Sequence, residues 1–76
     1  MIRELDTVVL THDLHENGLE CGDIGAVVHA YGAGSAFEVE FVTAAGKTVA
    51  LLTLTPDDVR PMNSREILHA RVFQSA

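Results

Sequence analysis

Hydrophobic and polar positions alternate strictly in the middle of the chain. Three large apolar residues, Phe37, Val39 and Phe41, are separated by Glu38 and Glu40. A period of two residues is typical of a β-strand with one face buried and the other in water. The glutamates therefore mark the outer face of the expected sheet, and the apolar residues mark its core.

Two further runs rich in β-branched residues flank this strand, at 24–31 and 48–54. Glycine-containing triplets at 32–34 and 44–46 separate the three runs, which predicts a three-stranded antiparallel meander. Gly25 lies inside the first run, where a glycine suggests a β-bulge or a close approach of another backbone.

The triplet at 44–46 sets the expected register of the last two strands of the meander. A three-residue loop with its glycine in the left-handed conformation suits Ala-Ala-Gly, and it pairs Phe41 with Val49. A slip of one residue would exchange the faces and expose Val49 and Leu51 instead. In either register an apolar strip reaches the outer face. In the chosen register, the outward residues are Val42, Ala50 and Leu52.

Shorter strands are expected at both ends of the meander, at 6–11 and 59–62, with Pro61 indicating an edge position. A long loop, 12–22, follows the first strand. The segment Thr55-Pro56-Asp57-Asp58 suits a single helical turn just before the last strand. These elements predict an all-β fold, a small five-stranded SH3-like barrel. Its expected core is Val8, Leu10, Ile24, Ala26, Val28, Phe37, Val39, Phe41, Val49, Leu51 and Val59.

The 76 residues are expected to form one barrel domain at 1–62 and a C-terminal helix or tail at 63–76. Asn63 and Glu66 have the spacing of a capping box, which favours a helix to about Phe73. An extended tail is the alternative. Its apolar residues would dock on the barrel or face a partner.

Four segments, at 5–10, 22–28, 37–41 and 59–61, resemble a family of short bacterial proteins catalogued as a domain of unknown function. The resemblance extends to about Arg71. It implies the barrel and a bacterial origin, and it transfers no catalytic residues. Residues 22–27 are also similar to the glycine-containing strand of KOW modules, the small SH3-like domains of ribosomal and transcription-elongation proteins.

The net charge is −6, from five basic and eleven acidic residues, and the basic residues are scattered. Nucleic-acid binding needs clustered Lys and Arg, so the charge argues against that partner and favours a protein. No run is long enough to cross a bilayer, and no signal peptide is recognised, so a cytoplasmic location is expected. The single cysteine, Cys21, agrees with a reducing compartment.

Candidate chemistry is sparse. His12, His15 and Cys21, with His29, could supply metal ligands if the long loop brought them together, but their spacing does not require this. Asp57 and Asp58 could be catalytic carboxylates, although their position before the last strand suits a helix start. We therefore predict no enzyme activity, no catalytic residues, no cofactor and no metal.

The sequence favours a non-catalytic protein–protein interaction module, either the partner of a neighbouring protein, as antitoxin and immunity proteins are, or a homodimer. The alternative is a KOW-like RNA- or ribosome-associated protein. The predicted interface comprises Val42, Ala50, Leu52, Ile67, Leu68, Val72 and Phe73.

Overall fold

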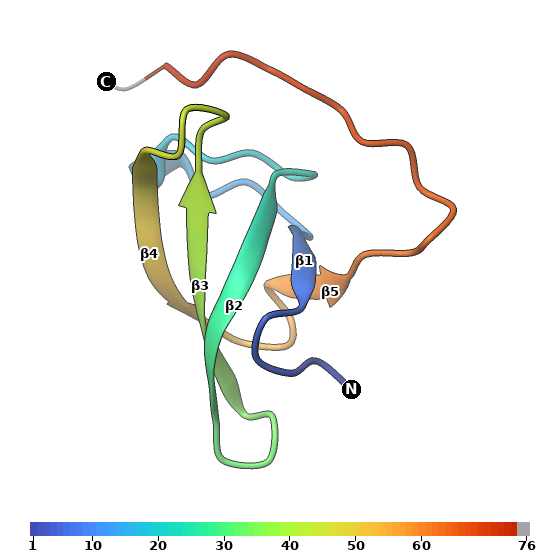
Figure 1. Ribbon diagram of the computed structural model, residues 1–76. Helices are drawn as coiled ribbons and strands as arrows, with labels where there is room; N and C mark the ends of the chain where they lie inside the picture. Colours follow the sequence, from blue (N-terminus) through green and yellow to red (C-terminus); the bar gives the residue numbers. More distant parts are fainter. Residues whose placement is uncertain (75–76) are drawn as a thin grey trace.

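The computed structural model describes residues 1–74 and contains one five-stranded antiparallel sheet in the order β4-β3-β2-β1-β5 (Figure 1). Strands β2, β3 and β4 form the predicted meander, and β1 lies between β2 and β5. The structure confirms the all-β, SH3-like architecture. The strands are β1 (Thr7–Leu10), β2 (Ile24–Tyr31), β3 (Ala36–Val42), β4 (Thr48–Leu54) and β5 (Val59–Pro61).

The helical turn lies elsewhere than expected. Within the described residues the one helical element is a 3-10 turn, His15–Asn17, in the long loop after β1. Before β5 the chain makes a tight turn, in which the Asp58 N–H donates to the Thr55 carbonyl at 2.9 Å. No helix in residues 1–74 is long and apolar enough to cross a membrane.

The alternation in β3 is confirmed. Phe37 and Phe41 are 2% exposed and Val39 is fully buried, whereas Glu38 and Glu40 lie on the other face. This inner face of β3 is the middle of the core. The other members of the buried cluster are Val8, Leu10, Leu19, Val27, Leu54 and Val59.

Strand β2 has the opposite phase from the one predicted. Gly25 and Val27 are buried, and Ala26 and Val28 are exposed. A Cβ on Gly25 would lie 2.6 Å from the Val39 side chain, so β3 packs directly on the glycine backbone. The close approach predicted at Gly25 is therefore present, and it requires this position to face inward. A bulge after Val27 then shifts the register of β2 against β3 by one residue.

The turn between β3 and β4 forms as predicted. Gly46 has a φ of +84°, and the Thr43 N–H donates to the Lys47 carbonyl at 2.9 Å. A three-residue loop with a left-handed glycine has this geometry.

A bulge beyond the turn reverses the predicted faces of β4. Thr48 pairs with Val42, but the next partner of β4, Ala50, pairs with Phe41, which leaves Val49 as the extra residue. Ala50 and Leu52 therefore pack against the core, and their predicted outward orientation is wrong. The outward residue is Leu51, which is 52% exposed and was expected in the core. Val42, also 52% exposed, faces outward as predicted.

The C-terminal tail is extended, not helical. The capping-box hydrogen bonds do form, since Asn63 N–H donates to Glu66 Oε1 at 2.7 Å and Glu66 N–H donates to the Asn63 carbonyl at 3.0 Å. They close one turn, and no helix follows it. The tail leaves β5 and curves back past the end of the barrel towards the β3–β4 hairpin (Figure 1). Residues 75 and 76 of the predicted tail lie outside the described residues.

Candidate interaction surface at the C-terminal tail

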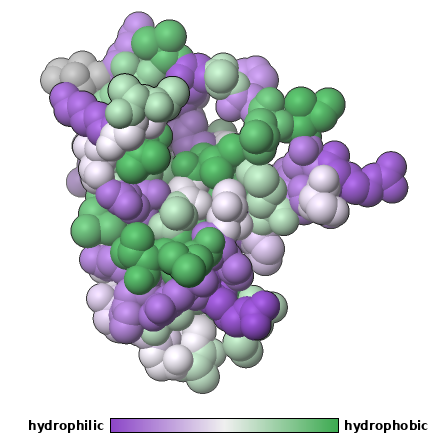
Figure 2. All heavy atoms as spheres, viewed as in Figure 1, coloured by the Kyte–Doolittle hydropathy of each residue, from purple (hydrophilic) through white to green (hydrophobic). Residues whose placement is uncertain are grey.

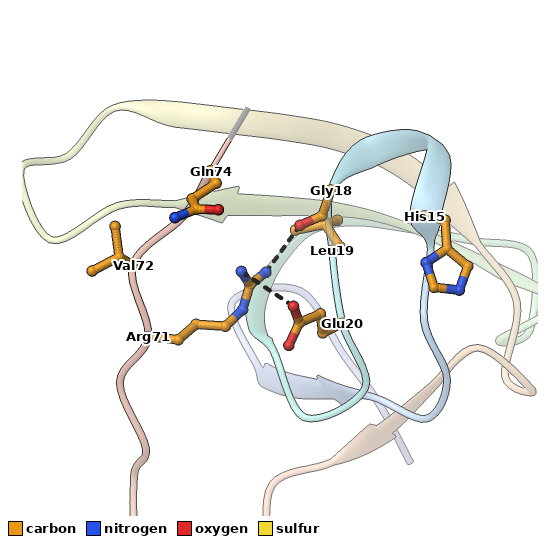
Figure 3. A pocket seen from close by; sticks show the side chains of 7 residues that line it. All are labelled: His15, Gly18, Leu19, Glu20, Arg71, Val72 and Gln74. Atoms are coloured by element: carbon orange, nitrogen blue, oxygen red, sulfur yellow. Dashed lines mark hydrogen bonds and ion pairs between the residues drawn. The ribbon is translucent and has the colours of Figure 1, made fainter. Parts of the chain in front are cut away.

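Arg71 anchors the tail to the loop that precedes β2. Its Nε donates to Asp23 Oδ1 at 2.9 Å and its Nη2 donates to Asp23 Oδ2 at 2.5 Å. Nη2 also donates to the Gly18 carbonyl at 3.0 Å, and Glu20 lies 3.8 Å from Nη1. Figure 3 shows the guanidinium pointing into this loop between Gly18 and Glu20. A planar guanidinium suits such a bidentate contact with a carboxylate.

The environment of Asp23 keeps this pair ionised. Burial alone would raise the pKa of Asp23, but hydrogen bonds from Arg71 and from the Glu20 backbone N–H outweigh it and lower the pKa below its usual value. Asp23 in turn raises the pKa of Arg71. The side chain of Arg71 is 28% exposed and that of Asp23 is 18% exposed. Water therefore screens this contact less than it screens an ion pair on the open surface.

Phe73 is the second contact of the tail with the barrel. It is half-buried and packs against the core cluster. Its ring lies over Gly18, where a Cβ would come within 3.2 Å of Phe73 Cε1. Gly18 has a φ of +71°, a left-handed conformation that glycine adopts without strain. Phe73 thus docks on its own barrel, which was one of the two possibilities for the tail.

A second ion pair fixes the start of the tail. Arg60 donates from Nη1 and Nη2 to the two carboxylate oxygens of Glu66, at 2.8 and 2.7 Å. The hydrogen bonds from Arg60 and from the Asn63 N–H lower the pKa of Glu66 to about 2. The two ion pairs therefore hold the tail near β5 and at Arg71, and Phe73 adds an apolar contact beyond Arg71.

Apolar side chains between and beside these anchors stand in water. Ile67 is 94% exposed, Leu68 69% and Val72 81%. We call these three residues the tail surface. Figure 2 shows hydrophobic groups on the tail that project away from the body of the barrel. All three were predicted interface residues, and their role stays a prediction.

Two hollows flank Arg71. The larger, with a volume of about 860 Å³, lies between the tail and the β3–β4 hairpin, and its wall includes Val42, Val49 and Val72. The smaller, about 460 Å³, lies towards the 3-10 turn, where His15 and Glu20 line it (Figure 3). The larger hollow has room for apolar side chains of a partner next to the tail surface.

Asp58, one of the two candidate catalytic carboxylates, closes the turn before β5. It accepts hydrogen bonds from the Thr55 N–H at 2.9 Å and from His12 Nε2 at 2.7 Å. Both hydrogen bonds lower the pKa of Asp58, and the one from Thr55 has the larger effect. The hydrogen bond with Asp58 raises the pKa of His12. Asp57 is exposed beside it. The contacts of Asp58 explain it as part of the turn.

The candidate metal ligands lie apart. Among residues 1–74, no three His, Cys, Asp or Glu side chains converge in a way that could hold an ion. His12 contacts Asp58, and His29 lies 3.2 Å from Glu4 on another part of the surface. Cys21 is exposed.

Sequence reasoning missed both anchors of the tail. The basic residues, Arg60 and Arg71 among them, are scattered along the sequence, and the Arg71–Asp23 contact joins residues 48 positions apart. No local pattern indicates such a contact.

No curated protein and no solved structure matches this chain. The profile of one family does match, over residues 4–61, which is the barrel from the N-terminal segment to the end of β5. The tail surface lies beyond the matched segment. The chain therefore belongs to the family described as Domain of unknown function (DUF4926).

Proposed function

We propose that this protein is a non-catalytic protein–protein interaction module that binds its partner through the tail surface. One observation carries the proposal. Two arginine–carboxylate contacts hold an extended segment on the barrel, and this segment presents Ile67, Leu68 and Val72 to water. Clustered exposed apolar side chains usually mark a contact surface.

The energetics favour binding at this segment. Burying a Leu, Ile or Val side chain contributes about 1.5–3 kcal/mol. A tail already tied to its barrel loses less conformational freedom on binding than a free tail would. The hollow beside the β3–β4 hairpin offers additional apolar contacts.

Charge supports the choice of partner. With a net charge of −6, the module attracts a protein whose apolar contact surface is surrounded by basic groups. An antitoxin- or immunity-like role beside a neighbouring protein in a bacterial cytoplasm fits this chemistry by analogy. The exposed, unpaired Cys21 suits a reducing compartment. The tail surface lies beyond the residues that the family profile matches.

The test uses the product of the adjacent gene as the candidate partner. The two proteins are co-expressed, and binding is measured by co-purification and titration calorimetry. We expect Ile67→Asp with Leu68→Asp to weaken binding at least about tenfold, because each charge must then be buried. Leu5→Asp is the matched control, since Leu5 is 88% exposed on the N-terminal segment. Undiminished binding by the double variant would contradict the proposal.

A KOW-like role in RNA binding is the competing proposal. Arg60 and Arg71 are engaged with Glu66 and Asp23, so two of the five basic residues already neutralise carboxylates. We expect no mobility shift of bulk RNA at physiological salt. Micromolar, salt-dependent binding would favour the KOW-like role instead.

A further inference from the structure

Strand β4 is an unpaired edge of the sheet. It stands at the end of the strand order, beyond β3, and no element lies on its other side in Figure 1. Within residues 1–74, the backbone hydrogen bonds outside the strand ladders involve no residue of 48–54. Alternate N–H and C=O groups of such an edge point outward and can pair with another strand.

The side chains of β4 do not protect this edge. Natural edge strands are commonly blocked by lysine, proline, inward charges or bulges. β4 reads Thr-Val-Ala-Leu-Leu-Thr-Leu and carries no charge and no proline. Its bulge at Val49 lies near one end, so the run from Ala50 to Leu54 pairs regularly with β3. Leu51, in the middle of the strand, is 52% exposed.

The opposite edge of the sheet cannot offer the same surface. β5 has three residues, Val59–Pro61, and Pro61 has no N–H to donate. Head-to-tail pairing of β4 with β5 of another molecule is therefore disfavoured. An edge that can pair only with its own copy gives a closed, two-fold arrangement and not a filament.

We propose that β4 pairs antiparallel with β4 of a second copy of this chain, with Leu51 on the two-fold axis. This register places Leu51 opposite Leu51 of the other copy on the outer face. Ala50 then lies opposite Leu52 of the other copy on the core face. Core-facing residues therefore pair with core-facing residues, and outward residues pair with outward residues.

The acidic charge of the molecule does not oppose this pairing. The nearest carboxylates, Glu38 and Glu40, lie on β3 and accept hydrogen bonds from Thr53 Oγ1 and Thr48 Oγ1, each at 2.5 Å. The two copies of Glu40 would be separated by three strand spacings, about 14 Å. This exceeds the Debye length of about 8 Å at physiological salt, so their repulsion is largely screened.

The β4 edge and the tail surface are different parts of the molecule. Partner binding at the tail and self-association at β4 can each hold without the other. The variants that test them do not overlap.

The first test measures the mass of the full chain in solution by sedimentation at several concentrations. We expect a monomer–dimer equilibrium, which Leu51→Glu shifts towards monomer by about tenfold or more, because it places two like charges opposite each other. Val28→Glu is the matched control: Val28 is also exposed, at 42%, but it lies on β2, two strands away from the β4 edge. It should leave the dimer unchanged. A monomer at all concentrations, or equal effects of both variants, would overturn the proposal.

The second test does not depend on the stability of a charged variant. In a Cys21→Ser background, Leu51→Cys should form a disulfide-linked dimer under mild oxidation. Residues directly opposite in an antiparallel pair have Cα atoms about 4.5–5.5 Å apart, within reach of a disulfide. Thr53→Cys should not cross-link, since its two copies would be four residues out of register. Absent cross-linking at position 51, or equal cross-linking at position 53, would overturn the proposal.

Discussion

At the scale of single residues, Gly25 determines how closely β2 and β3 approach. Its missing side chain leaves the space that Val39 and Phe41 occupy, since a Cβ there would lie 2.6 Å from Val39 Cγ1 and 2.8 Å from Phe41 Cε2. Both neighbours are buried and cannot move into solvent. The glycine is therefore required by packing, while the conformation of its own backbone is ordinary.

We expect Gly25→Ala to lower the free energy of unfolding by about 1–3 kcal/mol, the usual effect of overpacking a core. Urea denaturation followed by circular dichroism measures this. Ala26→Ser, on the exposed face of the same strand, should change stability by less than about 0.5 kcal/mol. A Gly25→Ala protein as stable as the wild type would mean that β3 does not pack on this backbone.

His12 and Asp58 provide a second residue-level prediction. The hydrogen bond to Asp58 raises the pKa of His12, so Asp58→Asn should move that pKa down towards 6.5. Because the folded pKa is the higher one, the contribution of this contact to stability is complete below pH 6.5 and is lost as pH rises through the folded pKa. NMR titration of the His12 ring measures the shift. Asp57→Asn removes the adjacent carboxylate and should leave the His12 titration in place.

At the scale of elements, the sequence predicted strands well and their faces less well. β3 alternates without interruption, so its buried residues could be identified directly. In β4 the bulge at Val49 adds one residue, which reverses every side chain that follows; in β2 the phase is already set by the inward Gly25, before the bulge at 27–29. Apolar runs such as Val49-Ala50-Leu51-Leu52 do not indicate where a bulge falls, because either face could be buried.

In the tail, too, the local sequence pattern does not determine the conformation. Asn63 and Glu66 form the capping-box contacts expected of them, yet Glu66 also binds Arg60, and Arg71 and Phe73 contact the barrel while the chain is extended. A short helix is marginal without packing of its apolar face. The tertiary contacts decide the conformation here, and the local signal ends after one turn.

The start of the tail should respond to acid. The pKa of Glu66 is about 2 in the folded protein against 4.5 without its partners, so its contribution to stability is complete above pH 4.5 and is lost as pH falls towards 2. We expect the stability difference between wild type and Glu66→Gln to shrink over this range, as measured by urea denaturation at each pH. Arg60→Gln should respond in the same way. If the difference stays constant, Glu66 is not paired in solution.

At the scale of the whole molecule, stability depends on very few large side chains. The core cluster contains two aromatic residues, Phe37 and Phe41, and a domain of this size has little stability to lose. The apolar pattern of the tail was visible in the sequence: Ile67, Leu68 and Val72 were predicted interface residues, and the structure leaves them exposed. The anchors that position them depend on the folded barrel.

Phe41→Ala should therefore destabilise the protein by about 3–5 kcal/mol, which is enough to unfold most of a small domain. Phe41 is 2% exposed, whereas its neighbour Val42 is 52% exposed and serves as the control, Val42→Ala. Thermal unfolding by circular dichroism compares the two. A cooperative, stable Phe41→Ala protein would contradict the placement of Phe41 at the centre of the core.

The Arg71 contacts also have a consequence for folding kinetics. They join Arg71 to Asp23 and Gly18, 48 and 53 positions away, whereas the β2–β3–β4 meander closes through short turns. Long loops close at a greater entropic cost, so we expect the tail to dock after the transition state of the barrel has formed. Contacts absent from a transition state slow unfolding without accelerating folding. In stopped-flow experiments Arg71→Ala should thus unfold faster and refold at the wild-type rate. The docked tail lengthens the lifetime of the native protein and leaves the time needed to reach it unchanged.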